Sequence, residues 1–496
     1  MPRNLSKSKL LAFKQCPKRL WLEVHKPKMK EDGAATQASY AIGNQVGDIA
    51  RDLYDPHKKG TLIEIAPGKF GDALAESKAL LESDKPVFEA GFSAKGALVF
   101  ADVMLPDEAR PGSWRMIEVK SSTSVKDYHR LDAAIQAYVA KQTGVSLSAI
   151  SLAHIDNQFV YEGDGQYRGL LRENDLTNET SNREQEVVQL IAAAQRTADE
   201  EEEPSLATGR QCREPYECGF LTYCQANEAT AKAPATWLPS RHNKELAALV
   251  VNNSVEMAGV PDELLNEKQL LVKRCTISGE AFVDLDGARE ALPEVDGAAY
   301  FMDFETVNPA IPIWQGARPY QIMPFQFSVH EQSYSGDLGH HEFLDISGED
   351  PSRKFAESLL DACGSDGPVF VYNAGFEKGR VSELAERFPD LSGQLLAINA
   401  RVFDLLTITR RYYYHPDQHG SWSIKKVLPT IAPHLNYANL DGVQDGSAAM
   451  VGYDEAISIN TTDSRKNEIG KQLLEYCKLD TLALVEIWRY FTDQKL

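Results

Sequence analysis

The chain of 496 residues contains no stretch close to the roughly 18 consecutive apolar residues that a membrane-spanning helix needs. Its first 20 residues, MPRNLSKSKLLAFKQCPKRL, interrupt each short apolar run with a lysine and so lack the apolar region of a secretory signal. We therefore expect a cytoplasmic protein that does not insert into a membrane.

An excess of positive charge is also lacking, because 52 Lys and Arg stand against 72 Asp and Glu, which gives a formal net charge of -20. This balance argues against a protein that merely coats nucleic acid. It does not exclude a nuclease, because metal-binding carboxylates add negative charge themselves. The chain also lacks the G-x4-G-K-[S/T] phosphate-binding loop, so ATP-driven unwinding would require a partner such as a helicase.

The length exceeds what one hydrophobic core supports, and 43% hydrophobic with 25% charged residues is typical of globular proteins. Short strand-like and helix-like patterns alternate, which predicts a multidomain α/β protein. We expect one domain over residues 1–228, a helical bridge over 229–297 and a further domain over 298–496. The run of five acids at 199–203 is expected to stay solvated.

The first group of candidate catalytic residues lies on two expected strands. Asp102 ends one of them, and Glu118 and Lys120 alternate on the next, so the side chains of Glu118 and Lys120 point to one side. If the strands are neighbours, Asp102 joins them, and two carboxylates with the Val119 carbonyl offer oxygens to a divalent cation. Lys120 would then orient or deprotonate water and stabilise charge on a phosphate. An ordinary surface hairpin with a Glu–Lys pair is the alternative.

The spacing Asp102-x15-Glu118-x-Lys120 resembles the D-(x)n-E-x-K signature of PD-(D/E)XK nucleases. Gln136 and Tyr138, on the helix expected next, are similar to the glutamine and tyrosine that RecB-type members pack against the site and the DNA. The resemblance implies a PD-(D/E)XK fold and one Mg²⁺ or Mn²⁺ ion. The early segment in which the family tends to place a metal-coordinating histidine or acid has no histidine here, so a further ligand is unassigned.

Seven cysteines are present, and an odd number in a reducing compartment argues against a disulfide framework. The sequence FKQCPKRLW and the later run C-x5-C-x5-C resemble the cysteine set of iron–sulfur RecB-like nucleases, which include AddB and the CRISPR-associated exonuclease group. The resemblance implies that four thiolates hold a [4Fe–4S] cluster. A structural Zn²⁺ site would use the same residues, and inert buried thiols are a third alternative. These four residues are Cys16, Cys212, Cys218 and Cys224.

The second group of candidate catalytic residues lies in the last 200 residues. Asp303 and Glu305 alternate on an apolar strand, Glu377 lies where a helix should begin after another strand, and Tyr476 and Asp480 share one helical face. Four carboxylates brought together from strand and helix segments suit a phosphodiester site with two Mg²⁺ or Mn²⁺ ions.

The order D-x-E, N-A-x-F-E and Y-x3-D resembles the DnaQ-like 3′–5′ exonucleases of RNase H-like fold, in their tyrosine-bearing form. The resemblance implies that Tyr476 positions the attacking water and that Asn373 adjoins the nucleic acid. Glu377 departs from the usual aspartate by one methylene. Tyrosines interleaved with basic residues up to Lys425 and Lys426 suit stacking on bases and contact with phosphates, or else form an ordinary packing surface.

Taken over nearly the whole chain, the motifs resemble a bacterial family that fuses a RecB-like iron–sulfur nuclease module to a DnaQ-like exonuclease module. The resemblance implies metal-dependent degradation or end-trimming of DNA, in repair or in defence against foreign DNA. An RNA-processing exoribonuclease and a non-catalytic scaffold that binds nucleic acid are the alternatives.

Overall fold

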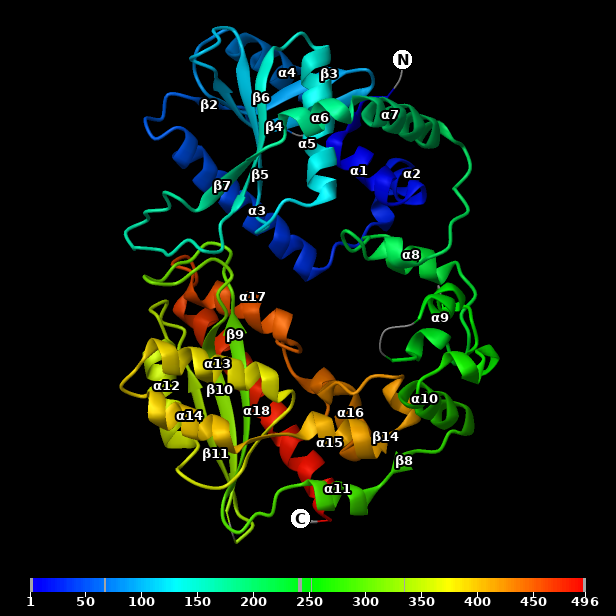
Figure 1. The fold of residues 1–496 in the computed structure, drawn as a ribbon, viewed down its shortest axis with the longest axis vertical. Helices are drawn as coiled ribbons and strands as arrows, with labels where there is room; N and C mark the ends of the chain where they lie inside the picture. Colours follow the sequence, from blue (N-terminus) through cyan, green and yellow to red (C-terminus); the bar gives the residue numbers. More distant parts are fainter. Residues whose placement is uncertain (1–2, 67, 240–242, 251, 334, 494–496) are drawn as a thin grey trace. The chain divides into compact units, whose positions relative to one another are not determined.

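The computed structural model describes residues 3–66, 68–239, 243–250, 252–333 and 335–493. It is a mixed α/β protein of two compact units (Figure 1), which confirms the expected multidomain α/β class. The first unit comprises Met1–Glu228 and Pro309–Tyr320, and the second comprises Ala229–Asn308 and Gln321–Leu496. The expected bridge, residues 229–297, therefore belongs to the second unit. In the described parts of the chain, no helix has both the length and the apolar composition needed to cross a membrane.

The first unit is built on a seven-stranded mixed sheet of order β2-β3-β4-β5-β6-β7, with β1 beside β4. Strands β3, β4 and β5 form an antiparallel meander, and β6 pairs with β5 in parallel. The β3–β4 turn is tight because Lys95 and Gly96 both adopt positive φ, 53° and 79°. The strands are β1 (Leu5–Ser6), β2 (Thr61–Leu62), β3 (Val87–Ala94), β4 (Ala97–Pro106), β5 (Trp114–Lys120), β6 (Leu147–Ile155) and β7 (Leu171–Asp175).

Helices cover both faces of this sheet. Leu131 of α5 and Val187 of α7 pack with Met116 of β5 in the main core, whereas Val46 and Tyr54 of α3 pack on the other face. Because both faces are covered, the last six residues of β6 are all buried. The helices are α1 (Lys7–Gln15), α2 (Pro17–His25), α3 (Ala34–Tyr54), α4 (Phe70–Leu80), α5 (Asp127–Gln142), α6 (Thr177–Asn182), α7 (Glu184–Asp199) and α8 (Leu221–Ala226).

The second unit is built on a five-stranded sheet of order β11-β10-β9-β12-β13. Strands β9, β10 and β11 are antiparallel, and β12 and β13 run parallel to β9. Two short strands, β8 and β14, form a separate pair. The strands are β8 (Phe282–Val283), β9 (Ala299–Val307), β10 (Met323–Gln332), β11 (Leu338–Leu344), β12 (Val369–Val371), β13 (Val402–Asp404) and β14 (Tyr413–Tyr414).

Alternation along β9 separates two cores. Met302 packs with helices α12, α13 and α14, whereas Phe301 packs with Trp488 of α18 on the opposite face. Odd-numbered side chains of β9 therefore point to the face that α18 covers. The helices are α9 (Lys244–Leu249), α10 (Glu267–Ser278), α11 (Leu285–Ala291), α12 (Ser352–Ala362), α13 (Ala374–Arg387), α14 (Ser392–Arg401), α15 (Leu405–Tyr412), α16 (Ile424–Ile431), α17 (Gly446–Ile457) and α18 (Asp463–Thr492).

Candidate active sites

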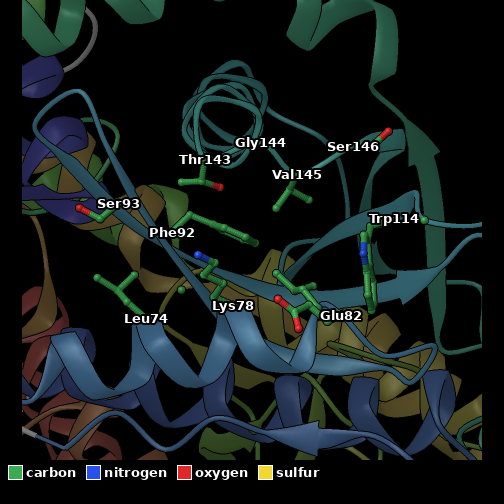
Figure 2. A pocket seen from close by; sticks show the side chains of 13 residues that line it. Leu74, Lys78, Glu82, Phe92, Ser93, Trp114, Thr143, Gly144, Val145 and Ser146 are labelled. Carbon is green, nitrogen blue, oxygen red and sulfur yellow. The ribbon is translucent and has the colours of Figure 1, made fainter.

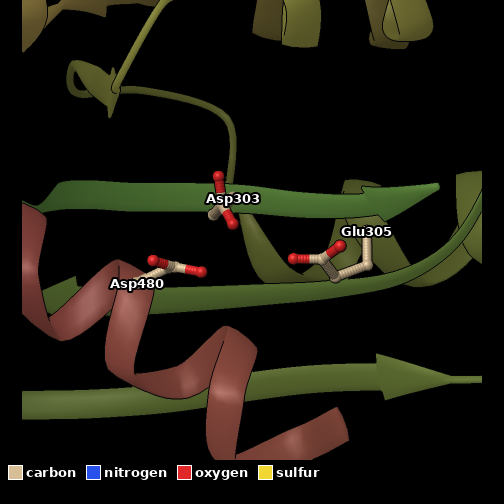
Figure 3. Close-up of side chains that lie close together, drawn as sticks. All are labelled: Asp303, Glu305 and Asp480. Atoms are coloured by element: carbon tan, nitrogen blue, oxygen red, sulfur yellow. The ribbon is translucent and has the colours of Figure 1, made fainter. Parts of the chain in front are cut away.

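Three carboxylates meet on one face of the second unit's sheet. One oxygen each of Asp303, Glu305 and Asp480 lies within 4.8 Å of the others. Figure 3 shows Asp303 and Glu305 projecting from β9 toward Asp480 on α18. Alternation along β9 places the carboxylates of Asp303 and Glu305 side by side, and the packing of α18 on β9 brings Asp480 next to them.

A cavity of about 320 Å³ opens beside these carboxylates, and Asn373, Glu377 and Tyr476 also line it. Glu377 lies in the first turn of α13 and is 3% exposed. Its Oε2 is buried and accepts no hydrogen bond from the residues that the structure describes. Buried carboxylate oxygens normally have a donor or a cation. Four carboxylates with an unsatisfied oxygen are therefore a donor set that fits Mg²⁺ or Mn²⁺.

Burial raises the pKa values of these four carboxyls, and repulsion by other carboxylates of the set adds to the effect at Asp303 and Glu305. Burial, and then the charges of Asp480 and Glu305, raise the pKa of Asp303 well above its usual range. Burial and Asp480 raise the pKa of Glu305 to about 8. Burial raises the pKa of Glu377 to about 8 and that of Asp480 to about 6. A divalent cation among them would remove the repulsion and favour the ionised carboxylates.

Two tyrosines and a lysine surround Asp480. The hydroxyl of Tyr437 donates a hydrogen bond of 2.5 Å to Oδ1 of Asp480, a contact that the sequence did not indicate. The Nζ of Lys425 lies 5.3 Å from the ring centroid of Tyr437 and 5.0 Å from that of Tyr476. Its charge opposes the effect of burial on the pKa of Asp480. Lys426, the next residue of α16, is exposed.

Asn373 forms the turn between β12 and α13. Its φ of 88° is left-handed, a conformation that asparagine tolerates better than most residues. In this turn its backbone N–H donates a hydrogen bond of 3.0 Å to Oδ1 of Asp404, at the end of β13. This turn begins the helix that carries Glu377 into the cavity.

The first unit brings Asp102, Glu118 and Lys120 to one place. Strands β4 and β5 are antiparallel neighbours, and the backbone N–H of Val119 donates a hydrogen bond of 2.6 Å to Oδ2 of Asp102. The Nζ of Lys120 contacts Glu118 and lies 2.7 Å from Oδ2 of Asp132 on α5. Glu118 and Lys120 thus share the side of β5 that faces α5.

Lys7 is a second lysine at this site that the sequence reasoning missed. Its Nζ lies 2.9 Å from Oε1 of Glu118 and 3.3 Å from Oδ1 of Asp132. Burial and Asp102 raise the pKa of Glu118 to about 7 despite these lysines. Burial acts to raise the pKa of Asp132, but Lys120 and Lys7 outweigh it and lower that pKa. Both oxygens of Glu118 thus already have donors, Lys7 and Lys120 at Oε1 and Gln136 at Oε2.

The backbone of β3 is irregular beside this site. Glu89 has a φ of 56° within the strand, and the residues before and after it pack on opposite faces of the sheet. The break leaves Glu89 near Asp102 and Glu118, whose charges affect one another. Left-handed backbone at a residue other than glycine is costly and is enriched at functional sites. No short-range sequence signal marked Glu89.

Gln136 and Tyr138 do not share a role. The buried Gln136 donates hydrogen bonds to Oε2 of Glu118 and, over 3.1 Å, to Oδ1 of Asp132. Tyr138 packs, partly buried, against the main core of the unit. Residues two apart on a helix do not share a face, so Tyr138 does not point where Gln136 does, and its contact with DNA stays a prediction. Asp132 and Gln136 are four apart and do share one, a spacing that could have identified Asp132.

The four candidate cysteine ligands lie near one another in the first unit. Three of them, Cys212, Cys218 and Cys224, are buried in a small cluster with Trp21. Burial raises the pKa of all three thiols, and Cys16 adds to the effect. All four are free thiols, and among the described residues no three of their sulfurs lie within 4.8 Å of one another. Four thiolates as a set would suit either an iron–sulfur group or a zinc ion.

The acidic run at 199–203 is only partly solvated. Four of its residues are exposed, but Glu203 is partly buried and lies 2.9 Å from the Nζ of both Lys18 and Lys26. The expectation is wrong at Glu203 because these two lysines lie on and beside α2, which packs near this turn. Cys477 is a buried thiol of α18. Its sulfur lies 3.8 Å from the backbone carbonyl oxygen of Asp303.

A further pocket of about 450 Å³ lies at the other end of β5 from Lys120 (Figure 2). Leu74 and Lys78 of α4, Phe92 of β3 and Trp114 of β5 line it. None of the candidate site residues is among the described residues that line it. This pocket is therefore separate from both candidate active sites.

Comparisons with known proteins concern part of the chain. Residues 300–423 match the family described as a domain of unknown function, DUF2779. The chain is 28% identical over 216 residues to an uncharacterized protein of Mycoplasma genitalium, and the match covers 39% of this chain and 32% of that protein. It is also 24% identical over 212 residues to an uncharacterized protein of Ureaplasma parvum, and this match covers 38% of this chain and 30% of that protein. The chain thus spans about a third of the length of these curated relatives, whose names state no activity.

Proposed function

We propose that this protein is a metal-dependent nuclease that hydrolyses phosphodiester bonds of DNA, with its principal site in the second unit. The observation that carries the proposal is the convergence of Asp303, Glu305 and Asp480 around a cavity that also holds Glu377 and Tyr476. Buried like charges at such short distance cost free energy unless a cation or a proton neutralises them. A phosphodiester site with two divalent ions has this requirement.

Each side chain has a distinct role in this proposal. The four carboxylates would hold two Mg²⁺ or Mn²⁺ ions, which supply activation of water and stabilisation of the leaving oxygen. Tyr437 would fix the orientation of Asp480 through its hydrogen bond. Burial and Asp480 raise the pKa of Tyr476 above its usual range, so its hydroxyl keeps its proton and orients water rather than acting as a base.

The architecture of the second unit supports the resemblance to DnaQ-like exonucleases. Its sheet combines three antiparallel strands with two strands parallel to β9, and helices cover both faces. This arrangement is compatible with an RNase H-like fold. The D-x-E pair lies on β9, the strand in the middle of that sheet, where a rigid element holds both carboxylates.

The first unit is proposed as a second nuclease site, of PD-(D/E)XK type. The support is the meeting of Asp102, Glu118 and Lys120 on neighbouring strands of a mixed sheet flanked by helices. Asp132 and Gln136 would hold Lys120 and Glu118 in place through their hydrogen bonds. Because Lys7 already binds Glu118, this site supports the proposal less strongly than the second unit does.

The test of the principal site is digestion of end-labelled oligonucleotides by the full-length protein with Mn²⁺. Asp303→Asn and Asp480→Asn, each made with Lys120→Ala to silence the first unit, should lower the rate on the order of 10³-fold, because a catalytic metal contributes several kcal/mol. The matched control is Asp361→Asn in the same background, an exposed aspartate of α12 that does not line the cavity. Equal cleavage rates in the two site variants and in the control would contradict the assignment of this active site. Matched DNA and RNA strands would separate a deoxyribonuclease from an exoribonuclease, and binding without cleavage would indicate a scaffold.

We also propose that the four clustered cysteines hold a [4Fe–4S] cluster. Anaerobic purification should then give a brown protein whose iron and broad visible absorbance are lost in Cys218→Ser. The control is Cys275→Ser, which alters a buried thiol that lies in a different core, in the second unit. A colourless protein with one zinc per chain would decide for the zinc site instead.

A further inference from the structure

Strand β10 carries polar side chains on the face that α18 covers. Phe327 and Val329 of this strand pack into the core with α12, whereas Ser328 and His330 alternate with them and point to the opposite face. Such an alternation normally predicts that the polar face meets solvent. Here that face is buried, and none of its four polar side chains is more than 7% exposed. They are Gln326, Ser328, His330 and Gln332.

These four side chains form a polar seam between β10 and α18. At one end, the side-chain amide of Gln326 donates a hydrogen bond of 2.7 Å to the backbone carbonyl of Leu473. At the other end, the Nε of Arg489 donates one of 3.3 Å to the side-chain oxygen of Gln332. The polar seam therefore follows one side of α18 over about four helical turns.

Thr481 of α18 lies at the centre of the polar seam and is fully buried. Its Oγ1 lies 2.7 Å from the Oγ of Ser328 and 2.8 Å from Nδ1 of His330. The Oγ of Ser328 also lies 2.9 Å from Nε2 of His340 on β11. Burial lowers the pKa of His330 to about 3 and that of His340 to about 4, so both imidazoles are neutral at neutral pH.

The polar seam lies directly beside the candidate metal site of the second unit. Ser328 pairs with Asp303 across β10 and β9, and side chains of paired residues point to the same face of a sheet. Thr481 follows Asp480, whose carboxylate projects from α18 toward Asp303 in Figure 3. The same turn of α18 therefore supplies a carboxylate to the site and a hydroxyl to the polar seam.

Hydrogen bonds fix the position of a helix more strictly than apolar packing does. Apolar contacts are non-directional, whereas a hydrogen bond requires a particular distance and angle. A slip of α18 by one turn would move Asp480 by about 5.4 Å, which is more than the 4.8 Å that contains one oxygen of each of the three carboxylates. Such a slip would also leave the buried hydroxyl of Thr481 without its partners, at a cost of about 1–3 kcal/mol.

We propose that Thr481, Ser328 and His330 are positioning residues that hold Asp480 beside Asp303 and so set the metal affinity of the second unit's site. The proposal rests on the proposed nuclease function and adds to it residues that act through a metal ligand rather than on the metal or the substrate. Residues that orient metal ligands in this way typically contribute about 10- to 100-fold to metal affinity.

The test compares two substitutions of Thr481 in the full-length chain with Lys120→Ala, so that cleavage reports the second unit. Thr481→Val keeps the shape of the side chain and removes the hydroxyl, whereas Thr481→Ser keeps the hydroxyl. Thr481→Val should raise the Mn²⁺ concentration for half-maximal cleavage roughly 10- to 100-fold, and Thr481→Ser should stay close to the parent protein. The matched control is Thr492→Val, also on α18, where the hydroxyl bonds to the carbonyl of Trp488 in the same helix over 3.0 Å.

The Mn²⁺ dependence separates positioning from a merely structural role. A loss of folded protein would lower the rate at every Mn²⁺ concentration without moving the half-maximal point, whereas a displaced ligand moves that point and leaves most of the rate at saturating Mn²⁺. An equal Mn²⁺ requirement in Thr481→Val and Thr481→Ser would overturn the positioning role while the nuclease function stands.

A second measurement decides the positioning role if the parent protein cuts nothing, an outcome that would reject the nuclease function by itself. Hydrogen exchange of the α18 backbone in EDTA, followed by mass spectrometry, reports how firmly this helix is held without metal. Thr481→Val should lose protection in the peptide that contains Tyr476 and Asp480, whereas Thr481→Ser and Thr492→Val should keep it. Equal protection of this peptide in all three variants would overturn the positioning role in that case.

Discussion

Glu305 and Glu377 are the residues whose protonation depends most on what the second unit's cavity contains. Burial raises the pKa of each to about 8, and Asp480 adds to the effect at Glu305. In the metal-free protein both carboxyls therefore hold protons at neutral pH. A divalent cation has to displace these protons, so metal affinity is linked to pH at the level of single side chains.

The same two residues predict how stability depends on pH. Their pKa values are raised on folding, so their contribution to stability is fully present below about pH 4.5 and is lost as pH rises through about 8. Saturating Mn²⁺ should replace the protons and restore that stability. We expect the Mn²⁺-induced rise in Tm to be larger at pH 8 than at pH 6, as measured by differential scanning fluorimetry. Asp303→Asn should reduce the rise at both values, and an equal rise at pH 6 and pH 8 in the wild type would contradict this account.

At the scale of elements, the segment Pro309–Tyr320 is the least expected feature. This segment connects β9 to β10, which both lie in the second unit, but it packs in the first unit. Ala310 and Ile311 bury their side chains with Val46, Ile155 and Leu170. Residues that come shortly after the D-x-E strand in the sequence therefore form part of the first unit's core.

Two isoleucines of this segment provide a matched comparison. Ile311 is 9% exposed and packed, whereas Ile313 is 44% exposed. Ile311→Ala should lower the free energy of unfolding of the first unit by about 2 kcal/mol, the low end for a buried isoleucine. Ile313→Ala should change it by less than about 0.5 kcal/mol.

Hydrogen exchange of the residues around Ile155 and Leu170 in the full chain would report the first unit separately from the second. Loss of protection there in Ile311→Ala but not in Ile313→Ala is the expected result. Equal protection in both variants would mean that the segment contributes little to this core.

At the scale of the whole molecule, the two candidate sites are built by separate sheets and separate cores. Each unit supplies its own carboxylates, so disabling one site should leave the other intact. We expect Lys120→Ala and Asp303→Asn each to keep part of the Mn²⁺-dependent cleavage of single strands, and the double variant to lose it. A gel assay with end-labelled strands measures this. Loss of all cleavage in either single variant would show that the two sites act as one.

The sequence by itself determined the contacts that depend on short-range geometry. Alternation along a strand places Asp303 beside Glu305 and Glu118 beside Lys120, and one helical turn relates Tyr476 to Asp480. These relations follow from backbone periodicity, which does not depend on the rest of the fold. The α/β class followed from the same periodic patterns.

Only the tertiary structure decided which distant residues join these pairs. Lys7 is 111 residues from Glu118 and Tyr437 is 43 residues from Asp480, and neither position carries a signal in its own neighbourhood. The placement of Pro309–Tyr320 in the first unit likewise depends on how helices and loops pack on a sheet. Burial of apolar surface selects that packing for the chain as a whole, so no local pattern can express it.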